Sequence, residues 1–351
     1  MPPLFRPDRL TIQWHITDSC NLRCRHCYQH SWRGEHIRWP VLYNIANHIL
    51  AFHQQLSGKI PLPLLITLTG GEPFTHPDFF RLLAYLQTHP ARPHIAILTN
   101  GTLITAKRAA ALAKFKLAFI QLSVEGVRKT HDDIRGMGNL QKVLNATQYL
   151  VQAGQRVLWS FTAHRENWQD FPLVAELAQK YAVNRLWLDR LIPCRETLPQ
   201  SLSQEETQHL FRTMLLTKRR LSSSWIKNFI GKYYPQPQIE ISMLRALQFQ
   251  WSGEKPYRCR AGEALLTIMP DGTVYPCRRL PITVGNLHHT SLMDIYQHSP
   301  FIRQLRAFHA PSQCRMCTFA SHCRGGLRCL AWAVTQDAFN ADPGCPFTMP
   351  A

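Results

Sequence analysis

The first two thirds of the chain alternate short apolar runs with longer helix-like stretches, and this alternation limits the fold more than any other feature. Six successive strand and helix units imply a parallel sheet that is covered by helices. The pattern therefore predicts an α/β fold. The expected strands are 10–16, 64–68, 94–98, 118–124, 156–162 and 185–191, and the expected helices are 41–55, 77–87, 105–114, 140–153, 170–181 and 203–220.

The residues that directly follow the six expected strands are polar, glycine-rich or reactive. In order they are a cysteine triplet, Gly-Gly-Glu-Pro, Thr-Asn-Gly, Ser-x-Glu-Gly, Thr-x-His and Pro-Cys. A parallel sheet of this kind carries its chemistry at the carboxyl ends of its strands. Loops after strands are commonly polar in any case, which is the alternative explanation. The pattern predicts a functional site at this edge.

The eleven cysteines are the most informative feature of the composition. No apolar run approaches the roughly 18 residues of a membrane-spanning helix, and the N-terminus has no apolar signal core. We therefore expect a cytoplasmic protein with no membrane partner. In a reducing compartment, clustered thiols indicate metal or redox sites in preference to disulfides.

The formal net charge of +18 is spread along the chain. The basic residues form one tight run at 218–220, and further basic and aromatic residues follow it up to position 234. Either this segment is a solvated face, or it is a groove for an acidic segment of a substrate or partner. Because the charge is dispersed, we expect no nucleic acid partner.

The first group of cysteines is Cys20, Cys24 and Cys27, with the spacing C-x3-C-x2-C. Three thiolates within eight residues can hold three irons of one cubane cluster and leave the fourth iron open. The alternative is a structural zinc site, which needs four ligands and could be completed by His26 or His30.

This triplet, placed just after the first strand, resembles that of the radical S-adenosylmethionine (SAM) enzymes, and the resemblance covers nearly the whole chain. It implies a partial (β/α)6 barrel of the TIM type and a 4Fe-4S cluster whose open iron is chelated by SAM. It also implies an oxidoreductase chemistry. An electron from a donor such as flavodoxin or ferredoxin would cleave SAM to a 5'-deoxyadenosyl radical, which abstracts hydrogen from the substrate.

The resemblance also implies a set of SAM contacts. The motif at 70–73 matches the family's GGEP, whose glycines let the backbone approach the methionine moiety and whose carboxylate accepts a bond from the ammonium group. Arg135 would pair with the cofactor carboxylate, unless it is a surface residue, and Asn100 with Gly101 could be only a turn. The implied contacts are His26, Gly70, Gly71, Glu72, Pro73, Asn100, Ser123, Glu125 and Arg135.

Seven further cysteines lie between positions 259 and 345, in a region with few long apolar runs that bound metal could stabilise. Their C-x12-G-x4-C and C-x2-C-x5-C blocks resemble the SPASM extension, a small cysteine-rich α+β iron-sulfur domain, whereas a pair of zinc ribbons is the alternative. The resemblance implies one or two auxiliary iron-sulfur clusters. It assigns Cys314, Cys317, Cys323 and Cys345 to an outer cluster, and Cys259, Cys277 and Cys329 to an inner one.

Two departures from the SPASM pattern concern the inner cluster. Five residues separate Cys323 from Cys329 where the family usually has three, and the segment just before Cys259 contains no fourth ligand. The inner cluster could therefore have an open iron, be smaller or be absent. The remaining thiol, Cys194, is either an ordinary buried thiol, the missing inner ligand or a catalytic residue at the barrel mouth.

The expected domains are a radical SAM partial barrel at 1–200, a helical and basic connecting segment at 201–254, and a SPASM-type domain at 255–351. The leading functional hypothesis is maturation of a ribosomal peptide by a crosslink, a thioether or an epimerisation. The alternatives are a sulfatase-maturase-like enzyme or an enzyme of a haem precursor. A noncatalytic iron-sulfur or zinc scaffold is a hypothesis of a different class.

An acidic leader of the peptide is one expected partner. The first strand begins by about residue 10, which leaves no N-terminal extension for such a leader. The leader would then dock elsewhere, with the basic segment at 218–234 as a candidate, or be captured by a separate leader-binding protein.

Overall fold

The computed structural model describes residues 5–29, 36–127, 129–194, 196–222 and 238–347. Its centre is a ten-stranded sheet in the order β10-β9-β8-β1-β2-β3-β4-β5-β6-β7. From β8 to β7 all neighbouring strands are parallel, and β9 and β10 are antiparallel additions. The strands are β1 (Leu10–His15), β2 (Leu64–Thr69), β3 (His94–Thr99), β4 (Leu117–Ser123), β5 (Val157–Ala163), β6 (Arg185–Arg190), β7 (Glu240–Ser242), β8 (Leu265–Ile268), β9 (Thr273–Tyr275) and β10 (Gly285–Asn286).

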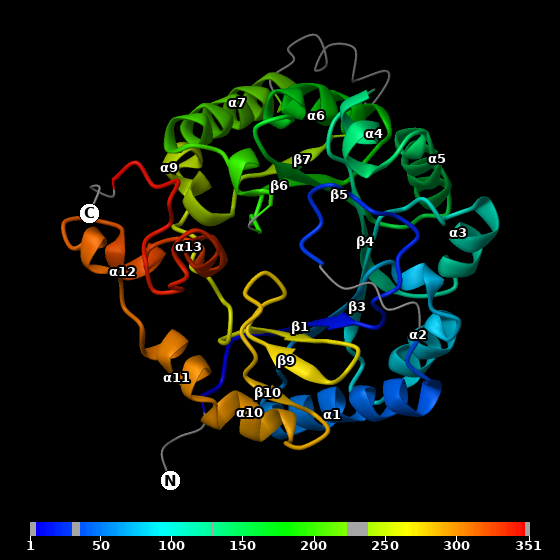
Figure 1. Cartoon of the computed structure of the whole chain (residues 1–351). Helices are drawn as coiled ribbons and strands as arrows, with labels where there is room; N and C mark the ends of the chain where they lie inside the picture. Colours follow the sequence, from blue (N-terminus) through cyan, green and yellow to red (C-terminus); the bar gives the residue numbers. More distant parts are fainter. Residues whose placement is uncertain (1–4, 30–35, 128, 195, 223–237, 348–351) are drawn as a thin grey trace.

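The helices of the first two thirds lie around the outside of the curved sheet, and the later helices gather beside its open end (Figure 1). This arrangement confirms the partial barrel followed by a C-terminal domain. The helices are α1 (Trp39–Ser57), α2 (Phe79–Thr88), α3 (Ala106–Leu112), α4 (Lys129–Arg135), α5 (Asn139–Gln152), α6 (Phe171–Lys180), α7 (Gln204–Ser222), α9 (Phe249–Ser252), α10 (Leu292–His298), α11 (Pro300–Ala307), α12 (Ala320–Cys323) and α13 (Arg328–Thr335), with short 3-10 turns η1 (Pro73–Thr75), η2 (Trp168–Asp170), η3 (Leu198–Gln200), η4 (Ala246–Gln248) and η5 (Ser312–Cys314).

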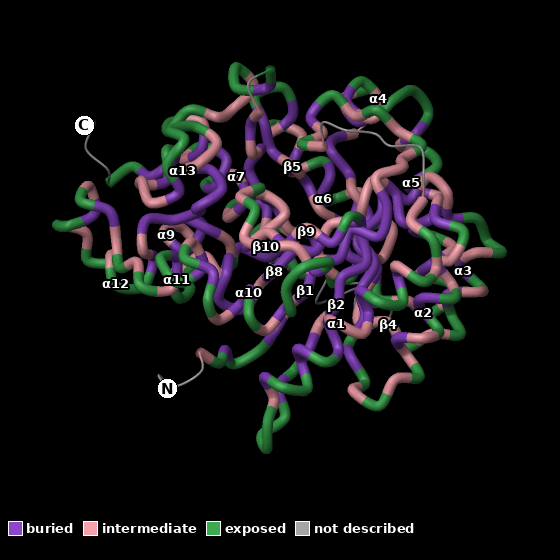
Figure 2. The backbone as a smooth tube through the Cα atoms, turned by 60° about the horizontal axis from the view of Figure 1, so that its bottom comes forward, coloured by how far each residue is buried: buried purple, intermediate pink, exposed green. Residues whose placement is uncertain are grey.

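The core lies between the strands and the inward faces of the helices, as the buried segments in Figure 2 show. Helix α1 buries Leu42, Ile45 and Ile49, which recur every three or four residues and so form one stripe. On β5, Trp159 is completely buried and donates its indole N–H to the Thr147 hydroxyl on α5 at 3.1 Å. That hydrogen bond satisfies the one polar group of a large core side chain.

The six expected strands all form, with ends within one residue of those expected, and the six expected helices form with ends within two. Helix α4 and the short strands β7 and β8 were not expected. Strand β8 pairs in parallel with β1, so that Thr11 lies opposite Leu265 and Trp14 opposite Ile268. The C-terminal region therefore adds a strand to the barrel sheet itself. Such pairing between distant segments leaves no local periodicity to recognise. The two boundaries between the three expected domains remain predictions.

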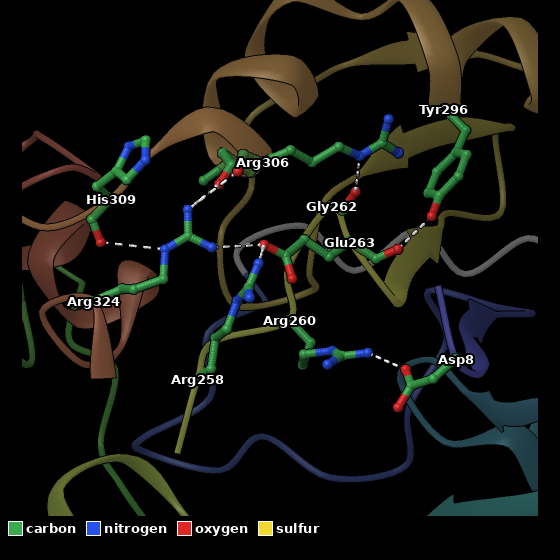
Figure 3. A network of polar contacts seen from close by, with 10 residues as sticks. Asp8, Arg258, Arg260, Gly262, Glu263, Tyr296, Arg306, His309 and Arg324 are labelled. Carbon is green, nitrogen blue, oxygen red and sulfur yellow. Dashed lines mark hydrogen bonds and ion pairs between the residues drawn. The ribbon is translucent and has the colours of Figure 1, made fainter. Parts of the chain in front are cut away.

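A buried carboxylate fastens the segment before β8 to the C-terminal helices (Figure 3). The Glu263 side chain accepts from Arg258 and from Arg324, the latter at 3.0 Å, and its backbone carbonyl accepts from the Tyr296 hydroxyl. Arg324 also donates to the His309 carbonyl at 3.2 Å. Because Glu263 is almost fully buried, its charge has to be compensated by partners of this kind.

The basic segment at 218–234 is described only as far as residue 222, where α7 ends, and its remainder lies outside the described residues. Among the helices that the structure describes, none combines the length and the apolar character needed to cross a membrane.

Candidate active site

A cavity of about 1080 Å³, counted out to its open mouth, lies at the carboxyl edge of the parallel strands. The thiols of the triplet line it, and so do residues at the ends of β2, β3, β4, β5 and β6. The structure thus places the triplet thiols and the residues that follow the strands together at this edge. Of the implied SAM contacts, those that line the cavity are His26, Gly70, Gly71, Asn100, Ser123 and Arg135.

The triplet thiols are half-buried and face polar hydrogens. Burial raises the pKa of Cys20 to about 11 and also raises the pKa of Cys27. The Cys20 sulfur accepts from the Leu22 amide at 3.4 Å and from the Asn100 side chain at 3.8 Å, and Arg135 lies 3.7 Å from the Cys24 sulfur. Metal binding would replace the protons that burial favours, and N–H donors stabilise the resulting thiolates. The residues fit an iron-sulfur cluster.

The two glycines of GGEP fix the segment that leads to Cys20. The Gly71 amide donates to the Thr17 carbonyl at 2.8 Å. A Cβ on Gly70 would lie 2.3 Å from the Thr17 oxygen, and one on Gly71 would lie 2.3 Å from the Ser19 oxygen. Gly70 also has a positive φ of 149°. Only glycine allows this approach of two backbones, a structural role that the sequence did not indicate.

Glu72 lies behind the cavity wall, fully buried. Its carboxylate accepts from the Thr99 hydroxyl at 2.7 Å, from the Asn100 amide at 2.8 Å and from the Phe74 amide at 3.2 Å. Both carboxylate oxygens therefore accept hydrogen bonds from the chain itself. These bonds hold the turn that places Asn100 in the cavity wall. Pro73 is also buried, at the start of η1. This geometry indicates that Glu72 positions the turn after β3.

Burial of Glu72 predicts a pH dependence of stability. Burial raises the pKa of this carboxyl from 4.5 to about 7, against the opposing hydrogen bonds. Between these values the folded chain holds a proton that the unfolded chain has released, so stability falls as the pH rises from about 5 to 7. We expect the unfolding free energy of the wild type, relative to Glu72→Gln, to decline by up to about 3 kcal/mol over this range. Denaturant titrations at pH 5, 6, 7 and 8 check this, and parallel profiles of the two proteins would contradict it.

Arg135 lies in the cavity wall rather than at the outer surface, with 11% of its side chain exposed, and Glu125 holds it. Helix α4 places its guanidinium 2.6 Å from the Glu125 carboxylate, which also accepts from the Thr162 amide at 2.6 Å. The His26 ring lies 3.4 Å from the same carboxylate. Burial works to raise the pKa of Glu125, but Arg135 and His26 outweigh it and hold the carboxyl well below its usual range. Glu125 therefore orients the two cavity residues His26 and Arg135.

Cys194 lies in the loop after β6, with its sulfur 3.2 Å from the Thr197 hydroxyl. It is not among the described residues that line the cavity. The two residues at the end of β6 do line it, and both are paired. Asp189 binds Arg245 at 2.8 Å and Arg279 at 2.6 Å, whereas Arg190 binds Asp342 near the C-terminus.

The cysteines that the resemblance assigns to the outer set lie together, and so do those assigned to the inner set. The four outer cysteines line one small cavity together with Phe249 and Phe319. In the inner set, burial raises the pKa of Cys329 strongly, and Cys277 and Cys259 raise it further by their proximity. Among the described residues, no three or more Cys, His, Asp or Glu gather around a point that would hold a single metal ion.

Sequence reasoning missed several residues of the cavity. Gln121 and Ser160 line it from inside β4 and β5, and Tyr28 follows the last cysteine of the triplet. Arg278 and Arg279 reach it from the turn after Cys277, far along the chain. Two consecutive arginines directly after an expected cluster ligand were the available signal.

Comparison with known proteins places this site in a family. The family model of the radical SAM superfamily matches residues 14–178, and that of the SPASM iron-sulfur cluster-binding domain matches residues 259–318. The chain is a radical SAM enzyme with a SPASM domain. Its cofactors are accordingly SAM and 4Fe-4S clusters.

Relatives of this radical SAM enzyme differ in what their names say of their substrates. It is 26% identical to the AdoMet-dependent heme synthase of Methanosarcina barkeri, over 95% of each chain. It is 25% identical to the mycofactocin maturase MftC of Mycolicibacterium smegmatis, over 96% of this chain and 82% of that one. The solved structure of native anSMEcpe with AdoMet and the Cp18Cys peptide has the same fold, with a TM-score of 0.74 and 18% identity over 97% of this chain and 94% of that one.

Proposed function

We propose that this enzyme cleaves SAM reductively at the cavity and abstracts hydrogen from a peptide substrate during the maturation of a ribosomal peptide. The observation that carries the proposal is the convergence of the three triplet thiols, two close-packed glycines and a carboxylate-oriented arginine on one cavity. The cavity opens at the strand edge, where a substrate can reach the cofactor.

In this proposal Cys20, Cys24 and Cys27 hold the cluster, which when bound supplies the electron that cleaves SAM. His26, Asn100, Ser123 and Arg135 contact SAM from the cavity wall, and the glycines at 70 and 71 hold the backbone in place. Glu72 and Glu125 act from behind the wall, by fixing Asn100 and Arg135, and Pro73 begins the turn that follows Glu72. Glu125 binds the Nε and Nη2 groups of Arg135, so that Nη1, which lies 3.7 Å from the Cys24 sulfur, is the group that faces the cofactor side.

The outer and inner cysteine sets hold the auxiliary clusters in this proposal, and an electron donor such as flavodoxin or ferredoxin reduces the enzyme. Cys194 is a candidate ligand of the inner cluster or a candidate catalytic residue. We place the enzyme in the cytoplasm, because eleven cysteines that form no disulfide among the described residues suit a reducing compartment. A separate leader-binding protein remains part of the proposal.

A second candidate substrate is a haem precursor. The observation in its favour is that the chain matches the heme synthase of M. barkeri from end to end, at 95% of each length, whereas it covers 82% of the peptide maturase.

Deuterium transfer from the substrate to 5'-deoxyadenosine, together with the stimulation of its release, distinguishes the two candidates. The anaerobically purified enzyme is supplied with SAM, dithionite and either a deuterated peptide encoded beside its gene or an iron porphyrin with propionate side chains. We expect nucleoside release in both cases and deuterium in the nucleoside with the peptide. Stimulation by the porphyrin alone would replace the first candidate by the second, and no nucleoside in any mixture would overturn the catalytic proposal.

A further inference from the structure

The wall of the cavity carries more positive charge than its described carboxylates compensate. Of the four arginines that line it, Arg135 is paired with Glu125, and Arg190 with Asp342. Arg279 shares the single carboxylate of Asp189 with Arg245. Because two guanidinium groups face one carboxylate there, one positive charge is left over.

Arg278 adds a second uncompensated charge. No described carboxylate pairs with it, and its guanidinium carbon lies 5.8 Å from the centroid of the Tyr28 ring. Both side chains line the cavity. The nearby His15 ring is neutral, because burial and the positive charge of Arg278 lower the pKa of His15 to about 3.

The backbone of Arg278 is held in a turn, whereas its guanidinium group has no carboxylate partner among the described residues. It occupies a turn closed by the hydrogen bond from the Leu280 amide to the Cys277 carbonyl at 2.9 Å. It lies beside Tyr28, the residue directly after the last triplet cysteine. The guanidinium thus lies in the cavity wall next to the triplet. Arg278 is therefore available to a bound molecule.

We propose that Arg278 binds a carboxylate of the substrate, and that the excess charge on Arg245 and Arg279 reinforces the selection of a carboxylate-bearing substrate. The inference rests on the proposed function, because it places the substrate in the same cavity as SAM. A planar guanidinium binds a carboxylate by two parallel hydrogen bonds, which also fixes the orientation of the substrate. The carboxylate can belong to an acidic peptide residue or to a porphyrin propionate.

Binding of matched acidic and neutral probes tests this inference. One pair is a Gly-Ala-Ser peptide carrying a single Glu and the same peptide carrying Gln. The other pair is coproporphyrin III and its methyl ester. Equilibrium dialysis against the anaerobic holoenzyme with SAM should show one acidic probe bound about tenfold more tightly than its neutral counterpart, and the preference should shrink at high salt. The pair that shows the preference identifies the source of the carboxylate.

Arg278→Gln should abolish this preference, and Arg278→Lys, which keeps the charge without the planar fork, should retain part of it. The matched control is Arg303→Gln, which removes the same charge from an exposed position on α11. A wild type that prefers neither acidic probe would overturn the proposal without use of any variant, as would an unchanged preference in Arg278→Gln. Substrate-free release of 5'-deoxyadenosine by the wild type is measured in parallel. This distinguishes a failure of carboxylate binding by Arg278 from a failure of the catalytic function.

Discussion

Replacement of Cys20, Cys24 and Cys27 together by alanine should reduce 5'-deoxyadenosine release to background and remove about four irons per chain. The reason is that these thiols line the cavity beside the SAM contacts and are the only cysteines of the described chain that do so. Iron and sulfide analysis of anaerobically purified protein, with a nucleoside assay under dithionite, measures both effects. Roughly 12 irons in the wild type would fit three cubane clusters, and roughly eight would fit two.

The matched control removes the same number of thiols from the outer set, as Cys314→Ala, Cys317→Ala and Cys323→Ala. This variant should lose a similar amount of iron but retain nucleoside release, because these thiols line a separate cavity. Zinc in place of iron in the wild type, or persistent release by the first variant, would contradict the assignment and favour the noncatalytic scaffold.

Neutralisation of Asp342 should destabilise the fold by about 3–5 kcal/mol. Its carboxylate binds the Arg190 guanidinium at 2.9 and 2.6 Å and also accepts from the backbone amides of Leu327 and Gly344. Both side chains are almost wholly buried, so Asp342→Asn leaves a positive charge without a partner in a dry environment. The pair joins the end of β6 to the C-terminal region, and a Cβ on Gly344 would lie 2.1 Å from the Arg190 guanidinium.

Anaerobic denaturant unfolding, read as a change in the unfolding free energy, measures the loss. Glu176→Gln serves as the control, because it breaks the exposed pair of Glu176 with Arg220 and should cost no more than about 1 kcal/mol. Adding Arg190→Met to Asp342→Asn should recover part of the stability, since the unpaired charge is then removed. Equal losses in the buried and the exposed variant would show that the buried pair has no special role.

The strands and helices of the barrel could be predicted because each has a pattern of apolar residues within its own stretch of sequence. The run from Leu64 onward is a strand and the stretch from Val41 onward is a helix by composition and spacing alone, and both form where expected. The triplet and the GGEP motif are local in the same sense. Their place at the strand ends followed from the general behaviour of parallel sheets, which brings loops after successive strands to one edge.

The partners of the buried charges could not be predicted in this way. Glu72 was expected to face SAM, whereas its carboxylate holds Thr99 and Asn100, which belong to the next strand and turn. The sequence also allowed Arg135 to be a surface residue, but the folded chain pairs it with Glu125 in the cavity wall. A sequence shows that a residue can be charged, and only the folded chain shows which opposite charge lies within reach.

The sequence by itself determined the six strand and helix units, the cysteine sets and the family to which they point, because apolar periodicity and ligand spacing are properties of neighbouring residues. The tertiary structure alone decided that β8 joins β1, that Arg190 meets Asp342 across the chain, and that Arg278 reaches the triplet cavity. These contacts join residues that are far apart in the chain. They form because folding buries the groups together, where charges and backbone polar groups must find partners within the protein.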